Sequence, residues 1–250
     1  MKKTKTYIIA EIGSTHDGSF GLAKQCIRAA ADCGVDAVKF QIHIFDAESL
    51  PNVPNPPWFK DETRKDYFNR IAFTVEQWKK LIKFSEECGV NFFASAFSLE
   101  AVDLLEKLGV KMHKIASGEV TNLPLLEKVA KTNKKVLLSS GMSSWEELDE
   151  AVNTLKNNGC SDLVVFQCTT EYPCPPEKAG LELIPSFKKR YGVSVGFSDH
   201  TSGIAIPIAA VVAGAEMIEK HFSLSTRPSP RAPPSPASPP RPGPPRARPG

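Results

Sequence analysis

Eight short apolar stretches, each rich in β-branched or aromatic residues, recur along the chain with helix-like segments between them. The intervening segments repeat apolar residues every three or four positions, and one begins at the capping residues Ser143 and Ser144 before Trp145. Strands that alternate with helices favour a parallel sheet covered by helices. The expected strands span residues 7–13, 37–42, 91–97, 112–117, 135–141, 163–169, 194–199 and 216–222.

Eight strand–helix units close most naturally into a (β/α)8 barrel, so the sequence predicts an α/β fold of the TIM-barrel class. An open doubly wound sheet is the alternative. The length of 250 residues and the hydrophobic content of 41 % suit one such domain, which we place at residues 1–225. No eighth helix is expected after the last strand.

The last segment, residues 226–250, holds 11 prolines, and its other residues are Arg, Ser, Ala, Gly and one Thr. Such a segment cannot build a core, so we expect it to be a disordered Pro/Arg-rich tail. Its PxxP spacings could be read by a groove-binding domain. GC-rich DNA that is translated in the wrong reading frame would encode the same residue types. The alternative to a real tail is therefore a frameshift artefact.

Charge and cysteine content exclude several classes of function. The formal net charge is +3, but five arginines lie in the tail, and the rest of the chain is near −2. This balance gives no electrostatic reason for nucleic-acid or membrane binding.

The six cysteines form no CxxC pair and are expected to be reduced. The apolar stretch at 7–10 is too short for a signal peptide, so we expect a cytoplasmic protein.

One connection, residues 43–74, is much longer than the others and combines four prolines with Trp58, Phe59, Tyr67 and Phe68. Connections of this length inside a compact domain are usually functional lids or disordered inserts. The aromatic residues favour an ordered flap on the mouth of the barrel.

Two of the five histidines, His200 and His221, end the last two expected strands. Neighbouring parallel strands lie roughly 5 Å apart, so the two side chains could share a divalent metal. Asp199 and Glu219 are expected to orient the imidazoles. Two nitrogen ligands completed by water suit Mn²⁺, Mg²⁺, Co²⁺ or Zn²⁺. A hydrogen-bonded rim without a metal is the alternative.

Lys39 and Lys114 lie inside strands that should be buried on both faces, where a charge needs a partner. The partner is either a carboxylate within the barrel, from Glu11 or Glu119, or an anionic substrate. Three serines at other strand ends could join the lysines in a cradle for a phosphate and a carboxylate. They are Ser117, Ser139 and Ser198.

Glu11 and Glu119 follow the first and fourth expected strands. Either carboxylate could bind a sugar hydroxyl, move a proton or pair with a lysine. Position alone leaves these roles open.

An ordered series of motifs over residues 7–222 resembles the N-acetylneuraminate (sialic acid) synthases. The motifs are IAEIG at 9–13 with HDG at 16–18, DAVKFQ at 36–41, KIASGE at 114–119, SSGM at 139–142, QCT at 167–169, YP at 172–173, GFSDHT at 196–201 and IEKHF at 218–222.

The resemblance implies an enzyme that condenses phosphoenolpyruvate with N-acetylmannosamine or a related amino-sugar aldehyde. In the implied reaction, C3 of phosphoenolpyruvate attacks the metal-polarised aldehyde, water adds at C2, and phosphate leaves by C–O cleavage. The implied metal ligands are His200 and His221, usually for Mn²⁺, with Mg²⁺ or Co²⁺ possible. The implied phosphoenolpyruvate contacts are Lys39, Lys114, Ser117, Ser139, Thr170 and Ser198. The implied sugar contacts are Glu11, Glu119 and Tyr172, and the catalytic set comprises Glu11, Glu119, His200 and His221.

Several departures from the family pattern affect these expectations. STHD at 14–17 replaces the commoner VNHN, and TTEY at 169–172 replaces TNIY, so the sugar need not be N-acetylmannosamine. After Phe222 the family continues through a loop, an eighth helix and usually a small antifreeze-like domain that this sequence does not match. The family's homodimer is disfavoured without that domain, and an isolated monomer is expected to have low stability.

Two alternative functions remain at this point. The chain could be a catalytically impaired barrel that displays its Pro-rich tail to a partner. It could also be another phosphoenolpyruvate-condensing barrel that acts on a sugar phosphate.

Overall fold

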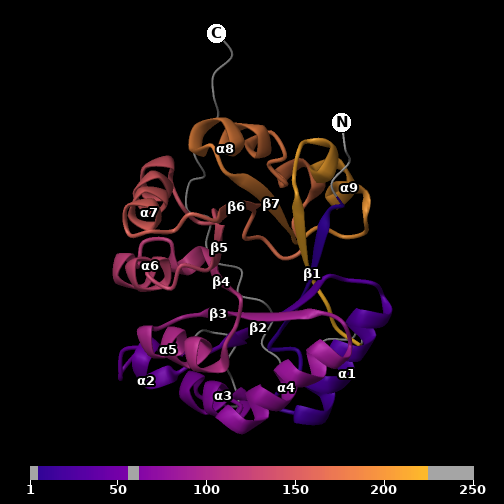
Figure 1. Ribbon diagram of the computed structural model, residues 1–250, viewed down its shortest axis with the longest axis vertical. Helices are drawn as coiled ribbons and strands as arrows, with labels where there is room; N and C mark the ends of the chain where they lie inside the picture. The colour runs from indigo at the N-terminus through magenta and orange to yellow at the C-terminus, as the bar shows by residue number, and fades with distance from the viewer. Residues whose placement is uncertain (1–4, 56–61, 225–250) are drawn as a thin grey trace.

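The alternating pattern folds into eight parallel strands, each expected strand being present with ends that differ by two residues at most. A computed structural model describes residues 5–55 and 62–224 (Figure 1). The strands are β1 (Tyr7–Gly13), β2 (Ala37–Ile42), β3 (Asn91–Ala96), β4 (Met112–Ile115), β5 (Lys135–Ser139), β6 (Leu163–Cys168), β7 (Ser194–Asp199) and β8 (Met217–His221).

Local signals in the sequence set the ends of the helices between these strands. Ser144 and Glu147 form a reciprocal capping box at the start of α7, and Gly109 ends α5 in the left-handed conformation. The helices are α1 (Phe20–Asp32), α2 (Phe45–Glu48), α3 (Arg64–Ile71), α4 (Val75–Glu87), α5 (Leu99–Leu108), α6 (Leu123–Ala130), α7 (Trp145–Asn157), α8 (Leu183–Tyr191) and α9 (Ala205–Val212), with 3-10 turns η1 (Ser117–Glu119) and η2 (Pro176–Lys178).

The sheet closes on itself in sequence order, β1 to β8, and β1 pairs in parallel with both β2 and β8. The predicted TIM barrel is therefore confirmed, and the open doubly wound sheet is excluded. Helices surround the strands on the outside of the closed sheet, as Figure 1 shows. Because all strands are parallel, their carboxyl ends meet at one end of the barrel, which we call the mouth.

The barrel interior has an apolar layer near the amino ends of the strands. Phe93, Phe166 and Leu137 are fully buried there with their neighbours from other strands. Gly196 on β7 makes room for Phe166, because a Cβ at that position would lie 2.5 Å from the Phe166 ring. Closer to the mouth the inward side chains become polar, so the apolar layer forms the floor of the site.

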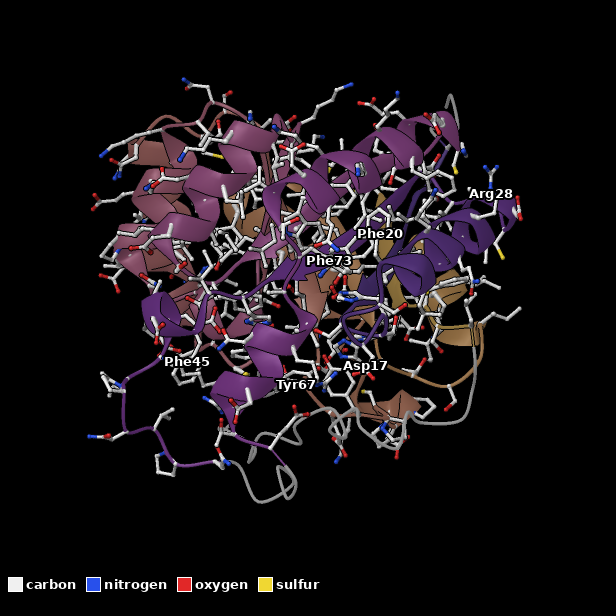
Figure 2. All side chains as sticks on the ribbon, turned by 90° about the horizontal axis from the view of Figure 1, so that it is seen from below. Asp17, Phe20, Arg28, Phe45, Tyr67 and Phe73 are labelled. Carbon is white, nitrogen blue, oxygen red and sulfur yellow. The ribbon has the colours of Figure 1, made fainter. Side chains whose placement is uncertain are left out.

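The long connection 43–74 lies against the mouth in its described parts, 43–55 and 62–74. Arg70 on α3 forms an ion pair with Asp17, which follows β1, at 2.6 Å and another with Glu62 at 2.7 Å. Figure 2 shows Tyr67 of α3 beside Asp17. These contacts agree with the expectation that the connection forms an ordered flap on the mouth of the barrel. Trp58 and Phe59, also expected to belong to it, lie outside the described residues.

Helix α9 carries an apolar face that the described residues leave open. Ile204, Ile208 and Val212 are 72 %, 58 % and 84 % exposed, and no helix follows β8 within residues 5–55 and 62–224. The expected tail, 226–250, lies outside the described residues.

Two expectations from composition can be compared with the fold. All six cysteines are free thiols, as predicted. Within the described ranges, no helix is long and apolar enough to cross a membrane.

Candidate functional site

Polar side chains project into the barrel from most of its strands, on the same face as the apolar floor. Glu11 pairs in register with Lys39 on β2 and with His221 on β8. Ser95 pairs with Lys114, and Ser198 pairs with Glu219. Side chains alternate between the two faces of a strand, so one inward residue fixes the direction of its neighbours two positions away.

Four buried charges form the centre of the site. Lys39 Nζ lies 2.8 Å from Glu11 Oε2 and 3.7 Å from Glu219 Oε2. Lys114 Nζ lies 3.2 Å from the same Glu219 oxygen and 4.1 Å from the centre of the Phe166 ring. The ion pair expected between Lys39 and Glu11 is present. Glu219, expected only near the histidines, is the carboxylate that joins both lysines.

The pKa values of the two carboxylates in this cluster are shifted in opposite directions. Burial raises the pKa of Glu11 to about 7, against the opposing effect of Lys39, and the charge of Glu219 adds to the increase. Burial also acts to raise the pKa of Glu219, but Lys114 and Lys39 outweigh it and lower that pKa below its ordinary value. The cluster therefore holds one permanent carboxylate and one that can carry a proton near neutral pH.

A second group of side chains converges on Gly141, just after β5. A Cβ on this glycine would lie 2.6 Å from Thr170 Oγ1, 2.7 Å from Ser117 Oγ and 3.2 Å from Cys168 Sγ. Thr170 Oγ1 is buried without a hydrogen-bond partner among the described residues, and so is Lys114 Nζ, which has only its ion pair. Buried donors of this kind indicate a bound polar ligand or water.

Ser139 and Ser198, the other two serines of the expected cradle, are both buried at strand ends. Ser198 Oγ donates to Glu219 Oε1 at 3.1 Å and so belongs to the charged cluster. Ser139 ends β5 two residues before Gly141, with no described side-chain contact to the cluster.

His200, His221 and Tyr172 form a group of rings at the mouth. The two imidazole centres lie 5.4 Å apart, and Tyr172 packs 3.9 Å from the His200 ring. His200 Nδ1 lies 2.7 Å from the carbonyl oxygen of Thr169, which leaves Nε2 as its free nitrogen. Burial lowers the pKa of His200. Burial, together with the proximity of His200 and Lys39, lowers that of His221.

The partners of Asp199 and Glu219 differ from those expected. Asp199 forms hydrogen bonds with Thr201 and an ion pair with Lys220, and Glu219 faces the lysines. The residue that orients an imidazole is Thr169, through its backbone carbonyl. A carbonyl could not be recognised from residue types, because every residue has one.

The histidine pair fits a metal only as part of a larger ligand set. Two imidazoles, one of them with its second nitrogen held by a carbonyl, are typical of transition-metal ligands. Within residues 5–55 and 62–224, no group of three or more His, Cys, Asp or Glu side chains could hold a metal ion. Such a metal would therefore need water or substrate oxygens to complete its coordination.

Glu119 lies apart from the charged cluster, on the side of the mouth formed by η1 and α2. Its carboxylate accepts from Asn122 Nδ2 at 2.9 Å. Burial raises the pKa of Glu119, and the neighbouring charge of Glu48 adds to the effect while His43 opposes it. The expected sugar contacts are thus split, with Tyr172 beside the histidines and Glu119 across the mouth.

One cavity, of about 650 Å³, lies away from these residues. It is a shallow opening at the amino-terminal end of the barrel, beside Lys111 and Lys135. In a TIM barrel the loops that carry function gather at the other end. Buried charges, unpaired donors and shifted pKa values also gather at the mouth, and we place the functional site there.

The chain is similar to known proteins over most of its length. The model of the NeuB family matches residues 26–232. The chain is 43 % identical over 229 residues to the N,N'-diacetyllegionaminic acid synthase of Campylobacter jejuni, covering 88 % of this chain and 68 % of that protein. It is 37 % identical to the N-acetylneuraminate-9-phosphate synthase of Mus musculus, covering 89 % and 63 %.

Among solved structures, the chain resembles the N-acetylneuraminic acid synthetase of Leptospira borgpetersenii in complex with citrate. The TM-score is 0.77 at 33 % identity, over 89 % of this chain and 74 % of that one. The chain spans about two thirds of the length of the two curated relatives.

Proposed function

The chain belongs to the NeuB family, and from that premise we propose that it condenses phosphoenolpyruvate with an amino-sugar aldehyde to form a nonulosonic acid. The observation that carries the proposal is the pair of buried lysines beside the Gly141 cradle. Unpaired donors in that arrangement match a small ligand with two anionic groups.

Phosphoenolpyruvate would lie over the apolar floor, between the charged cluster and Gly141. Lys114 Nζ and Thr170 Oγ1 lack hydrogen-bond partners among the described residues, so an anionic oxygen would satisfy both. Ser117 would donate from the other side of Gly141. We further assign Lys39, Ser139 and Ser198 to this ligand because all three are buried polar residues of barrel strands, on β2, β5 and β7.

His200 and His221 would hold a divalent metal, Mn²⁺ in our proposal, with Mg²⁺ or Co²⁺ as substitutes. When bound there, the metal supplies a Lewis acid for the aldehyde oxygen and a template for the two substrates. Thr169 keeps His200 in the tautomer whose Nε2 can be a ligand.

The sugar would bind at the mouth, between Tyr172 and Glu119. A new C–C bond joins C3 of phosphoenolpyruvate to the aldehyde carbon, water adds to C2, and inorganic phosphate leaves with its bridging oxygen. Glu11 is placed to hold or pass the proton that this sequence moves, because burial raises its pKa to about 7. The buried lysines would stabilise charge on the enol and on the departing phosphate.

The nature of the sugar is the least constrained part of the proposal. One curated relative is named for a diacetyllegionaminic acid and another for N-acetylneuraminate 9-phosphate. We propose an N-acetylated hexosamine aldehyde without a phosphate, because the described mouth shows carboxylates, Glu48 and Glu119, and not a second cationic pocket.

Phosphate release from phosphoenolpyruvate tests the proposal directly. The full chain, loaded with Mn²⁺, should release phosphate only when a suitable sugar is added, and the panel should include free and 6-phosphorylated N-acetylhexosamines. Lys114→Met should lower kcat/KM for phosphoenolpyruvate by at least about 100-fold, because a charge-assisted contact is lost. The matched control is Lys111→Met, an exposed lysine just before β4, at the end of the barrel away from the mouth.

Two results would count against the proposal. Phosphate release that Lys114→Met leaves unchanged would place the reaction elsewhere. A folded, metal-loaded protein that releases no phosphate with any sugar of the panel would favour the impaired barrel instead.

A further inference from the structure

His43, the residue after β2, lies between two phenylalanine rings. Its imidazole stacks on Phe68 of α3, with ring centres 4.2 Å apart and planes at 5°. On the other side it stacks on Phe97, which follows β3, at 4.1 Å and 18°. The side chain is only 11 % exposed. The two rings therefore fix the plane of the imidazole, and with it the direction of both ring nitrogens.

Each ring nitrogen of His43 faces an oxygen that can accept a hydrogen bond. Nδ1 lies 2.8 Å from Glu48 Oε1 on α2, and Nε2 lies 3.4 Å from Gln41 Oε1 on β2. A carboxylate and an amide oxygen have no hydrogen to give, so full pairing requires an N–H on both nitrogens.

The orientation of the Gln41 amide is set from its other end. Gln41 Nε2 donates to Glu11 Oε1 at 3.0 Å, which turns the amide oxygen toward His43 and toward Ser14 Oγ at 3.4 Å. Rotating the amide by half a turn would place its oxygen against the Glu11 carboxylate and its NH2 group against the His43 N–H. Both new contacts would be repulsive, so His43 stabilises the one orientation that supplies Glu11 with a donor.

We propose that His43 is a positioning residue for Glu11, acting through the Gln41 amide and held in place by Phe68 and Phe97. The inference rests on the proposed function, in which Glu11 touches substrate. Because Glu48 and Phe68 belong to the connection 43–74, the relay joins that connection to the charged cluster at the bottom of the site.

His43→Phe is the decisive variant, because it keeps an aromatic ring between Phe68 and Phe97 and removes both N–H groups. We expect kcat to fall on the order of tenfold, in line with the loss of other hydrogen bonds that orient site residues. The KM for phosphoenolpyruvate should stay within about twofold, since Lys114 and the Gly141 cradle are untouched. Phe68→Leu is the comparison variant, which loosens the stack but leaves the N–H groups in place, so it should lower kcat less than His43→Phe does.

If His43 had a purely structural role, the kcat values of the two variants would differ from this expectation. His43→Phe would then keep the wild-type kcat, or Phe68→Leu would lower kcat as much as His43→Phe does. Either result overturns the proposal. If His43→Phe does not fold, Glu48→Gln replaces it, since it exchanges the charged acceptor of Nδ1 for a neutral one and leaves the imidazole in the stack.

A measurement without turnover separates this inference from the proposed function. With ¹³C-labelled glutamate carboxyls, the Glu11 signal is identified by its loss in Glu11→Gln. Its chemical shift should change in His43→Phe and change less in Phe68→Leu. An unchanged shift in His43→Phe overturns the relay, whereas a changed shift in a protein that releases no phosphate keeps the relay and removes only the proposed reaction.

Discussion

The carboxylate of Glu219 lies 3.2 Å from the ammonium group of Lys114, in a part of the barrel that water hardly reaches. The same oxygen lies 3.7 Å from Lys39, so one buried anion serves two buried cations. An anionic ligand entering the site would share this role with Glu219.

Replacing Glu219 by glutamine should therefore destabilise the empty protein and make it more responsive to anions. Removing one partner of a buried ion pair typically costs about 3–5 kcal/mol, because the other charge stays buried. We expect a lower Tm for Glu219→Gln, and a larger rise in Tm on adding inorganic phosphate than the wild type shows. Differential scanning calorimetry with a phosphate titration measures both.

Glu216→Gln is the matched control for this variant. The ion-pair partner of Glu216, Lys188, is exposed. The substitution should therefore lower the free energy of unfolding by less than about 1 kcal/mol and leave the rise in Tm with phosphate unaltered. Equal melting temperatures for Glu219→Gln and the wild type would show that the lysines do not depend on Glu219.

The cradle at Gly141 gives a steric prediction. A methyl group there would lie 2.6 Å from Thr170 Oγ1, in the space assigned to phosphoenolpyruvate. Gly141→Ala should raise the KM for phosphoenolpyruvate at least about tenfold, and overpacking should cost about 1–3 kcal/mol of stability. Gly118→Ala, where an added Cβ meets nothing within 4 Å, should change neither quantity much. Steady-state kinetics on both variants tests this prediction. Similar KM values for phosphoenolpyruvate in Gly141→Ala and Gly118→Ala would show that the ligand does not occupy the cradle.

Acid should weaken the fold through His16. Burial lowers the pKa of His16 to about 4, and its Nδ1 accepts from the Gly18 amide, as only an unprotonated nitrogen can. Between about pH 6.5 and 4 the unfolded chain binds a proton that the folded chain does not, so the free energy of unfolding falls as the pH falls. This residue should account for a loss of about 2 kcal/mol between pH 7 and pH 5, measured by urea unfolding.

His16→Asn tests the assignment, because asparagine can accept the same bond two residues along without titrating. The loss between pH 7 and pH 5 should shrink in this variant, leaving the part due to His113, His200 and His221, whose pKa values burial also lowers. A loss as large as in the wild type would rule out His16 as its source.

The open apolar face of α9 should limit solubility more than folding. Ile208 and Val212 are 58 % and 84 % exposed, and exposed apolar surface of this kind promotes association. The double change Ile208→Gln, Val212→Gln should reduce aggregation in light scattering, while Tm shifts by no more than a few degrees because exposed positions contribute little to stability. A sharp drop in Tm would mean that the two side chains are covered in solution.

The unmodified chain itself should unfold below about 60 °C, because the surface of its last barrel units is incompletely covered. A higher Tm for the isolated monomer, measured by calorimetry, would contradict the expected low stability.

Much of the barrel could be predicted because its signals are local. Strand positions follow from apolar runs, and strand alternation even fixes which side chains point inward. On β8, His221 at the mouth implies that Glu219, two residues earlier, faces the interior as well, as it does. The role of Glu219 could have been inferred from that alternation, but its position beside two histidines suggested a different partner.

Contacts between loops could not be predicted in the same way. The ion pair between Asp17 and Arg70 joins residues far apart in sequence, and Thr170, Ser117 and Gly141 meet only because three strand ends turn toward one another. The sandwich around His43 depends on Phe68 in the long connection, whose path no periodic pattern specifies.

Closure of the barrel has a consequence for how the chain is made. β1 is the first strand to leave the ribosome, yet one of its edges is paired only by β8, the last. Lys39 and Lys114 likewise emerge long before Glu219, which neutralises both. A nascent chain therefore carries an open sheet edge, and Lys114 without its carboxylate partner, until its final strand is translated, and we expect it to depend on chaperones during that interval.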